Sequence, residues 1–506
     1  MEFPMDYMGN ILFGFSVCLQ PINLFYCFLG VFVGTLIGVL PGVGPVATIS
    51  MILPATFKMS PVGAIILLAG IYYGAMYGGS TTSILVNIPG ETASVITCLD
   101  GYQMARQGRA GPALGIAAFG SFIAGTFSVI GLTFMAPPLA KVAFRFGPPE
   151  YFSLLVLGMV LLIYLAHGSM IKALMMACMG LLLSYIGLDN ISGYERFTSG
   201  YATLEDGIGL VPVAMGVFGL GEVLTNIEES VSLREIFKSK ISNFLPTRQD
   251  WKDSALPIAR GSVMGFILGI LPGGGHVLAA FASYALEKRL SKKPEDFGRG
   301  AIAGVAGPES ANNAGAGGQF IPLLTLGIPA SPVMALMLGA LVIFGLQPGP
   351  LLMKRSPDLF WGVIISMYIG NIMLLVLNLP MIGLWIRVLR VPYPILFPLI
   401  ILFCMIGAYS INNNKFDVII MVLFGIIGYL MKKLRFEAAP MLLGLVLGIM
   451  MEDALRQSLI MSGGGFGVFV NRPISAGFIL AAAVLLAIPA IRGVKKILVT
   501  KLMENE

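Results

Sequence analysis

Oxygen-bearing side chains gather near two pairs of glycine- and proline-rich segments. These hydroxyl and amide groups are Ser80, Thr81, Thr82, Asn87, Asn312, Asn313, Gln319, Thr325 and Ser331. Such oxygens, with the carbonyls of uncoiled backbone, are ligands for a cation such as Na⁺, whereas free NH groups at a helix N-terminus hold a carboxylate or another anion. Few fixed positive charges lie near these segments, so backbone amides and helix dipoles are expected to do most of the holding of an anionic solute.

The first pair of segments is a repeat. Gly38-Val-Leu-Pro-Gly-Val-Gly-Pro45 returns as Gly269-Ile-Leu-Pro-Gly-Gly-Gly275, and both copies interrupt long apolar stretches. Pro removes a backbone donor and Gly tolerates positive φ, so each copy is predicted to break a membrane helix. The predicted helix breaks are at Pro41, Pro45 and Pro272, and the glycines proposed to hold a coupling ion are Gly42, Gly44, Gly273 and Gly275.

A second pair of segments lies downstream of the first. In one half, Gly78–Ser83 leads to Asn87-Ile-Pro-Gly-Glu-Thr-Ala93, and in the other, Gly315–Gln319 leads to Gly327-Ile-Pro-Ala-Ser-Pro332. The spacing from Gly79 to Pro89 matches that from Gly318 to Pro329 within one residue, which predicts a second break in each half. The candidate substrate-binding residues are Ser80, Thr81, Thr82, Asn87, Pro89, Gly90, Gly317, Gly318, Gln319, Pro329 and Ser331.

Two carboxylates stand inside otherwise apolar regions. Glu91 and Glu309 are candidates for ion binding or coupling, together with Asn312 and Asn313, because ionisable residues within a membrane mark ion or substrate pathways. The alternative for each carboxylate is a structural cap on a helix N-terminus, which the same dipole favours.

These motifs also have structural interpretations. Single glycines are typical of close helix packing in membranes, whereas Pro at matching points is not required by packing. No Gly-Lys-Ser or Gly-Lys-Thr follows the glycine runs, and there is no Ser-His-Asp set, HExxH or metal-spaced Cys cluster, so no catalytic or metal residues and no cofactor are expected. His276 follows the second glycine run and is an open candidate for a proton carrier, whereas His167 is expected in a surface turn.

Composition sets the class of protein. Of 506 residues, 57% are hydrophobic and 11% charged, with a mean hydropathy of +0.87, whereas soluble domains carry about 25% charged residues. About a dozen apolar segments approach bilayer length, which predicts an all-α polytopic membrane protein. The net charge of +6 resides in short basic clusters between these segments, as expected of cytoplasmic loops, and nucleic-acid binding is not expected.

The loop charges predict two halves of opposite orientation. The acidic loop Asp189–Asp206 is expected outside and the basic connection 226–255 inside, with a first membrane repeat in 1–225 and a second in 256–506 that ends in a basic cytoplasmic tail. Such inverted repeats are common in secondary transporters. Near the C-terminus, Glu452 and Arg456 have the spacing of a helical i,i+4 pair; we favour a charged loop between membrane helices over a contact surface for a partner subunit.

The chain resembles the large membrane subunit of the tripartite tricarboxylate transporters over almost its whole length. The resemblance is carried by Gly38–Pro45, Gly70–Ser83, Asn87–Ser94, Asp100–Arg109 and Gly269–Gly275, and by Arg456, Ser462–Gly464 and Arg472–Ser475. It implies a multi-pass permease of the bacterial inner membrane that works with a small four-helix membrane subunit and a periplasmic solute-binding protein. The implied substrate is citrate or another carboxylate, taken up with a Na⁺ or H⁺ gradient.

Two other functions remain open from the sequence. A stand-alone ion-coupled exporter or flippase of organic anions would use the same broken helices without a binding protein. A membrane scaffold without transport activity would not depend on the breaks at Pro41 and Pro272.

Overall fold

Helices form most of the part of the chain that the structure describes. The computed structural model describes residues 7–40, 42–166, 169–189, 191–228, 244–273, 275–389, 391 and 393–487. Pro41, His167, part of the predicted connection 226–255 and the basic C-terminal tail lie outside the described residues. The chain divides into two units, Met1–Ala143 with Gly209–Leu434 and Phe144–Ile208 with Arg435–Glu506, each built from two separate stretches of sequence.

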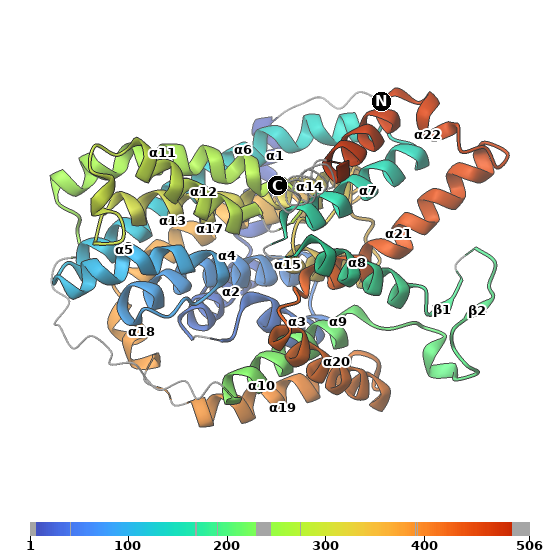
Figure 1. Ribbon diagram of the computed structural model, residues 1–506, viewed down its shortest axis with the longest axis horizontal. Helices are drawn as coiled ribbons and strands as arrows, with labels where there is room; N and C mark the ends of the chain where they lie inside the picture. The colour runs from blue at the N-terminus through green and yellow to red at the C-terminus, as the bar shows by residue number, and fades with distance from the viewer. Residues whose placement is uncertain are drawn as a thin grey trace, which may run out of the picture. The chain divides into compact units, whose positions relative to one another are not determined.

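The first unit holds most of the helices (Figure 1). Its elements are α1 (Tyr7–Cys18), α2 (Pro21–Val39), α3 (Pro45–Thr56), α4 (Pro61–Val86), the short η1 (Thr92–Ser94), α5 (Val95–Arg106), α6 (Ala110–Ala143), α9 (Leu210–Ala214), the π-helical η3 (Met215–Leu220), α10 (Gly221–Glu228), α11 (Arg248–Gly269), α12 (Gly275–Leu290), η4 (Pro294–Asp296), α13 (Ala303–Gly318), α14 (Phe320–Leu326), α15 (Pro332–Ile343), α16 (Leu352–Arg355), α17 (Pro357–Asn378), α18 (Ile382–Val388), α19 (Tyr393–Asn412) and α20 (Lys415–Lys433).

The second unit is smaller. Its elements are α7 (Pro148–Leu165), α8 (Met170–Ser184), β1 (Gly187–Leu188), β2 (Glu195–Arg196), η2 (Ala202–Leu204), α21 (Ala439–Met461), α22 (Val468–Asn471) and the helix Pro473–Ala487. Strands β1 and β2 pair antiparallel, with Gly187 opposite Arg196.

Length and composition confirm an all-α polytopic membrane protein. Among the described residues, seven helices are long and apolar enough to span a bilayer. They are Pro21–Val39, Pro61–Val86, Ala110–Ala143, Pro148–Leu165, Leu210–Glu228, Pro357–Asn378 and Pro394–Asn412. Shorter apolar helices of 10–17 residues, such as α3 and α15, accompany them, as the prediction of broken membrane segments requires.

Both repeated glycine-proline motifs end one helix and start another. Helix α2 ends at Val39 and α3 begins at Pro45, with Gly42 at φ +82° between them. Helix α11 ends at Gly269 and α12 begins at Gly275, with Gly273 at φ +114°. Only glycine adopts these backbone conformations readily, so the motif dictates the interruption. The predicted breaks within Gly38–Pro45 and Gly269–Gly275 are confirmed.

Glycine stripes pack α2 against α4. A Cβ added to Gly30, Gly34 or Gly38 would lie 2.3–2.4 Å from the carbonyl oxygens of Leu67, Ile71 and Ala75, respectively. Each of these contacting pairs lies four residues beyond the previous pair on both helices, so α2 and α4 run parallel. The chain between them returns through α3. The first break is therefore the tip of a hairpin.

The second half repeats this arrangement. A Cβ on Gly261, Gly265 or Gly269 would lie 2.2–2.4 Å from the carbonyl oxygens of Gly307, Ala311 and Gly315 on α13. Helices α11 and α13 therefore also run parallel, and α12 forms the returning arm (Figure 1). Close backbone approach is the expected use of small residues between membrane helices, so these glycines serve packing.

The second break in each half begins later than predicted. Helix α4 continues through Gly78–Ser83 to Val86 and ends at Asn87, in the left-handed region at φ +57°. The prediction of a break within Gly78–Ser83 is wrong, because Gly78 packs inside the helix pair: a Cβ there would lie 2.3 Å from the Thr35 carbonyl oxygen. Likewise, Gly315–Gly318 is helical, and the chain leaves α14 at Gly327, φ +71°.

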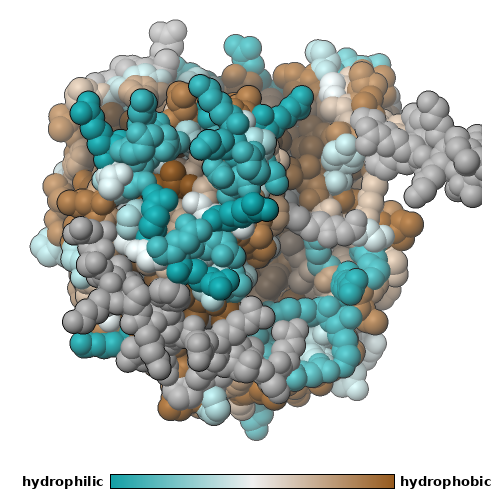
Figure 2. Space-filling model, turned by 60° about the vertical axis from the view of Figure 1, so that its left-hand side comes forward, coloured by the Kyte–Doolittle hydropathy of each residue, from teal (hydrophilic) through white to brown (hydrophobic). Residues whose placement is uncertain are grey.

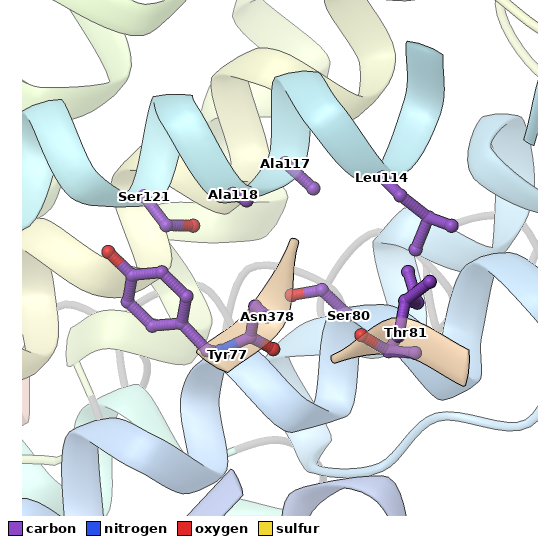
Figure 3. Close-up of a pocket in the computed structure, with 9 residues that line it drawn as sticks. Tyr77, Ser80, Thr81, Leu114, Ala117, Ala118, Ser121 and Asn378 are labelled. Carbon is purple, nitrogen blue, oxygen red and sulfur yellow. The ribbon is translucent and has the colours of Figure 1, made fainter. Parts of the chain in front are cut away.

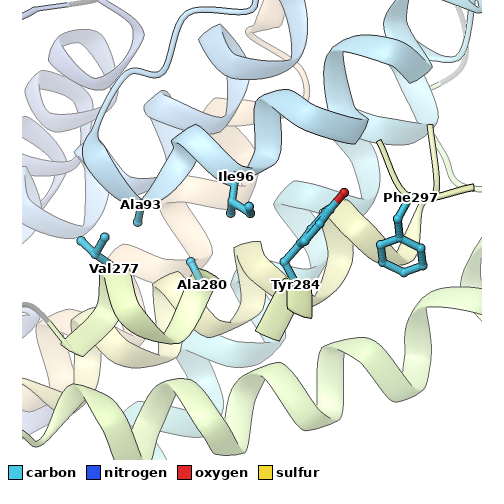
Figure 4. Packing of buried hydrophobic residues seen from close by; sticks show 6 residues of the cluster. All are labelled: Ala93, Ile96, Val277, Ala280, Tyr284 and Phe297. Atoms are coloured by element: carbon cyan, nitrogen blue, oxygen red, sulfur yellow. The ribbon is translucent and has the colours of Figure 1, made fainter. Parts of the chain in front are cut away.

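A buried apolar cluster joins α5 to α12. Ala93 and Ile96 of the first half pack on Val277, Ala280, Tyr284 and Phe297 of the second (Figure 4). Beside it, the carboxylate of Asp100 accepts hydrogen bonds from the backbone NH groups of Gly298, Gly300 and Ala301 at 2.8–2.9 Å and from the Tyr284 hydroxyl at 2.9 Å. Asp100 thus fixes the connection between α12 and α13 to α5.

Apolar side chains remain exposed on several helices of the first unit. Along α19, these include Ile395, Leu399, Leu402, Phe403 and Ile406, which are 46–58% exposed. Figure 2 shows hydrophilic side chains gathered together on one face, next to extensive hydrophobic surface. Since contiguous exposed apolar surface is unfavourable in water, we assign the hydrophobic areas to contact with lipid.

The smaller unit is held by an ionic cluster. Arg456 contacts Asp189 at 2.7 Å and Glu452 at 3.1 Å, and Arg196 contacts Asp189 at 2.6 Å and Glu452 at 2.7 Å. The i,i+4 pair is confirmed, but the prediction of a charged loop is wrong, because Glu452 and Arg456 lie within helix α21. The Arg456 guanidinium, with further hydrogen bonds from Ser192, the Ile191 backbone NH and Arg196, holds the pKa of Asp189 well below its usual range.

Candidate functional site

Helices α4 and α13 form the polar centre of the first unit. The Tyr72 hydroxyl donates to Oε1 of Gln319 at 2.9 Å, and the Ser80 hydroxyl donates to Oε2 of Glu309 at 2.5 Å. Residue numbers therefore increase along α4 as those of the contacting residues of α13 and its C-cap decrease, so the two helices run antiparallel. All 18 residues of the apolar window in α4 are buried, although the helix carries Ser80, Thr81 and Thr82.

Glu309 is the most enclosed carboxylate of this centre. Its side chain is 1% exposed, and it accepts hydrogen bonds from Ser80 and from the Thr97 hydroxyl, both at 2.5 Å. Among the ion pairs of the described residues, none includes Glu309 or Glu91. An ionised carboxylate without a cationic partner is costly in this environment, so a proton or a cation is needed to neutralise it.

Glu91 has the capping role that was one of its two alternatives. Its Oε2 accepts from the backbone NH of Ala93 at 2.7 Å, and the Ser94 hydroxyl lies 3.3 Å from the Glu91 NH, which makes a capping box at the start of η1. Its Oε1 also accepts from Nδ2 of Asn312 at 3.0 Å. The first-half and second-half candidates are thus in contact, and the pathway role of Glu91 stays a prediction.

The remaining amides extend this network. Nδ2 of Asn313 donates to the Ser121 hydroxyl at 2.7 Å and to the Glu309 carbonyl at 3.0 Å. Oε1 of Gln319 also accepts from the Ser331 hydroxyl at 2.6 Å, and its Nε2 lies 2.7 Å from Nδ1 of His276. Gln319, Ser331 and the open candidate His276 are therefore brought together at the C-terminal end of α13, whereas Glu309 lies near the middle of that helix.

The two breaks of each half also meet. In the first half, the Thr82 hydroxyl donates to the Val39 carbonyl at 2.8 Å, and a Cβ on Gly90 would lie 2.2 Å from the Gly38 carbonyl oxygen. In the second half, the NH of Gly273 donates to the Ala330 carbonyl at 3.0 Å. The segments carrying Asn87, Pro89 and Gly90, and those carrying Pro329 and Ser331, therefore flank the hairpin tips.

Some predicted glycines are packing residues. A Cβ on Gly317 would lie 2.1 Å from Oγ of Ser128, one on Gly318 would lie 2.8 Å from the Phe266 carbonyl, and one on Gly275 would lie 1.9 Å from the Leu268 carbonyl. These close contacts are with protein atoms, which accounts for glycine at each position. Gly44 differs, because a Cβ there would meet nothing within 4 Å.

A small cavity opens beside this network (Figure 3). It is lined by Tyr77, Ser80, Thr81, Leu114, Ala117, Ala118, Ser121, Asn378 and Ile382. Ser80 and Thr81 were predicted as site residues, whereas Tyr77, Ser121 and Asn378 were not. The available signal for Asn378 was an amide in the apolar run Leu374-Leu-Val-Leu-Asn-Leu-Pro380.

The fold and the comparisons with known proteins define the class of this protein. Buried polar residues between interrupted helices in a polytopic membrane protein define a solute transporter as the class to consider. The model of the tripartite tricarboxylate transporter TctA family matches residues 24–443, and the chain belongs to that family. The resemblance drawn from the sequence motifs is confirmed, and the protein is a multi-pass subunit of a transporter family.

Two relatives come from Agrobacterium vitis. An uncharacterized 52.8 kDa protein in the TAR-I ttuC' 3' region is 54% identical over 491 residues, which cover 96% of this chain and 98% of the relative. An uncharacterized protein in the TAR-II ttuC' 3' region is 56% identical over 231 residues, which cover 45% of this chain and 96% of the relative. No solved structure matches the chain.

Proposed function

We propose that this chain is the permease subunit of a binding-protein-dependent secondary transporter that imports carboxylates with a Na⁺ or H⁺ gradient. The substrates would be tricarboxylates such as citrate, or related organic acids. The observation that carries the proposal is the antiparallel contact of α4 and α13, each of which follows a broken hairpin and precedes a second break. This is the arrangement that inverted repeats place around a transported solute.

The order of elements supports inverted repeats. Hairpin α2–α3, buried helix α4 and the break before α5 correspond to hairpin α11–α12, helices α13–α14 and the break before α15. Exchanging the conformations of two such halves would convert a pathway open to one side into one open to the other. The family name indicates further components, which we propose to be a small four-helix membrane subunit and a periplasmic solute-binding protein, with the permease in the bacterial inner membrane.

The N-terminus of α3 is the position best suited to a substrate carboxylate. Gly44 is the N-cap residue of α3, provides no side-chain cap and borders open space, whereas Ser331 caps α15 and Glu91 caps η1 with their own side chains. Pro45 has no NH group, so the NH groups of the next residues of α3 and the positive end of its dipole would be available to an anion. The polar network around Glu309 would hold the coupling ion.

Uptake of radiolabelled organic acids into proteoliposomes tests the proposal. The purified permease, with and without its small subunit and binding protein, is assayed with a sodium gradient, with a proton gradient and with neither gradient. We expect uptake only with the partners present and one of the two gradients imposed. Full uptake without a binding protein would favour the stand-alone transporter instead, and no transport of any organic acid by the complete system would refute the proposed function.

Two substitutions connect uptake to the site. Ser80→Ala removes the hydroxyl bound to Glu309, and Asn87→Ala removes a side chain at the second break. Both are expected to lose uptake at normal expression. Because Asn87 has φ +57°, Asn87→Gly is the matched control that keeps the backbone conformation while removing the same side chain. Unchanged uptake in Ser80→Ala and Asn87→Gly would remove both side chains from the site.

A further inference from the structure

The cavity beside α4 is too small for an organic acid. Its volume is about 10 Å³, which is the space of roughly one water-sized sphere. A tricarboxylate has more than ten non-hydrogen atoms and cannot enter it in this conformation. Only a water molecule, a single hydroxyl group or a monatomic ion matches its size.

Two hydroxyl groups that line the cavity have already given their protons to other side chains, which leaves their oxygens as acceptors. The Ser80 hydroxyl gives its proton to Glu309, and the Tyr77 hydroxyl gives its proton to Oδ1 of Asn371 at 2.7 Å. Nδ2 of Asn378 donates to the Leu374 carbonyl at 2.9 Å, which leaves Oδ1 without a partner although Asn378 is only 4% exposed. Figure 3 shows this side chain in the cavity wall, near Ser80 and Thr81.

A buried carbonyl oxygen without a partner is unfavourable unless a donor or a cation reaches it. The same wall lies one hydroxyl group away from Glu309, whose carboxylate has no ion-pair partner among the described residues. The cavity therefore combines an unmatched acceptor with a nearby carboxylate that needs a proton or a cation to neutralise it. A water molecule would satisfy the first and leave the second.

We propose that this cavity is a sodium site, with Oδ1 of Asn378 and the hydroxyl oxygens of Ser80 and Thr81 as ligands. Ser121 and Tyr77 complete its polar wall, and the carboxylate of Glu309 balances the charge through Ser80. A monovalent ion fits better than Ca²⁺ or Mg²⁺, because those ions are held by several carboxylates or retained waters. Soft metal ions are also disfavoured, because they prefer sulfur ligands to neutral oxygens. The inference rests on the proposed function by placing its coupling ion at one position.

Sodium binding to the purified protein tests the site without any transport assay. Thermal unfolding in detergent is followed with increasing NaCl, with KCl or choline chloride replacing it at constant ionic strength, and binding of ²²Na⁺ is measured in parallel. We expect stabilisation by NaCl but not by choline chloride, and saturable binding of ²²Na⁺. Equal stabilisation by all three salts, with no saturable binding, would overturn the proposal and leave water as the occupant.

Asn23 provides a matched control for Asn378. Its Nδ2 also donates to a backbone carbonyl, its Oδ1 also lacks a partner, and it is also 4% exposed, but it does not line the cavity. Asn378→Leu is expected to weaken ²²Na⁺ binding at least tenfold, whereas Asn23→Leu retains wild-type affinity. Equal affinity in Asn378→Leu and wild type would refute this location.

A second variant guards against misfolding of Asn378→Leu. Thr81→Val keeps the shape of the side chain and removes its oxygen, and it is also expected to weaken ²²Na⁺ binding at least tenfold. If both variants fold and bind sodium normally, the site is excluded. If sodium binds and depends on Asn378 and Thr81 but no organic acid is transported, the ion site stands and the proposed function fails.

Discussion

Removing the carboxylate of Asp100 is predicted to release the connection between α12 and α13. One oxygen of Asp100 accepts three backbone NH groups, those of Gly298, Gly300 and Ala301, and the other accepts the Tyr284 hydroxyl. Hydrogen bonds to charged groups contribute about 1.5–3 kcal/mol each. Because Gly298 is exposed, water replaces part of this contribution. We therefore expect Asp100→Ala to cost about 3 kcal/mol in total, below the sum of the individual bonds.

The conservative variant separates charge from geometry. Asp100→Asn keeps an oxygen that accepts the three NH groups, and its NH₂ group can donate to the Tyr284 hydroxyl oxygen. Its expected cost is about 1 kcal/mol, the usual range for neutral hydrogen bonds. Asp296→Ala is the matched control, because Asp296 is an exposed aspartate of the same connection.

Hydrogen exchange of the backbone amides in 297–303 measures the effect directly. A loss of about 3 kcal/mol corresponds to roughly 100-fold faster exchange, and 1 kcal/mol to about fivefold. The amides are expected to exchange fastest in Asp100→Ala, more slowly in Asp100→Asn and slowest in the wild type. Asp296→Ala is expected to exchange at the wild-type rate. If the amides exchanged at the wild-type rate in Asp100→Ala, the buried apolar cluster that includes Phe297 would hold the connection alone. The role assigned to Asp100 would then be wrong.

Three further predictions concern the hairpins and the polar centre. Gly34→Ala and Gly265→Ala would place Cβ atoms 2.4 and 2.2 Å from carbonyl oxygens, so each is expected to lower the free energy of unfolding by about 1–3 kcal/mol. Gly44→Ala, the control, is expected to leave the thermal unfolding midpoint unchanged. Equal midpoints for all three variants would contradict the packing assignment. Glu309→Gln removes the charge but keeps one acceptor oxygen for the hydroxyl of Ser80 or Thr97, and its NH₂ group can donate to the hydroxyl oxygen of the other. It is therefore expected to fold and to reduce gradient-driven uptake at least about tenfold, which is about 1.4 kcal/mol. Wild-type uptake would exclude Glu309 from coupling. The side chains introduced by Gly44→Asp and Gly44→Asn can both cap α3, but only the aspartate is charged and repels an anion. Uptake should therefore fall much further in Gly44→Asp than in Gly44→Asn. Equal uptake in the two variants would remove the N-terminus of α3 from the substrate site.

The helix breaks were readable from the sequence because their cause is local. Gly42 and Gly273 occupy backbone conformations that other residues avoid, and Pro45 begins a helix where its missing NH is not needed. The glycines of Gly78–Ser83 were misinterpreted because the same residue type serves a second purpose. Whether a glycine bends a helix or admits a neighbour depends on the partner helix, which the local sequence does not identify.

The composition of the polar centre was predicted only in part. Ser80 and Glu309 were both selected, but they were assigned to substrate and ion, respectively, whereas the structure joins them in one hydrogen bond. Ser121 and Asn378 were missed because each stands in an apolar stretch, and Tyr77 was missed although it lies only three residues before Ser80. Their proximity arises from the packing of α4, α6 and α17, which lie far apart in the sequence.

The glycine contacts determine which parts can move separately. With backbone against backbone, α2 cannot slide or rotate on α4 without steric overlap, and the same holds for α11 on α13. Each pair is therefore a rigid arm, and large rearrangements are confined to movements of one arm relative to the other. Probe pairs attached within one arm should report a constant separation throughout the working cycle, while pairs spanning the two arms should report two separations.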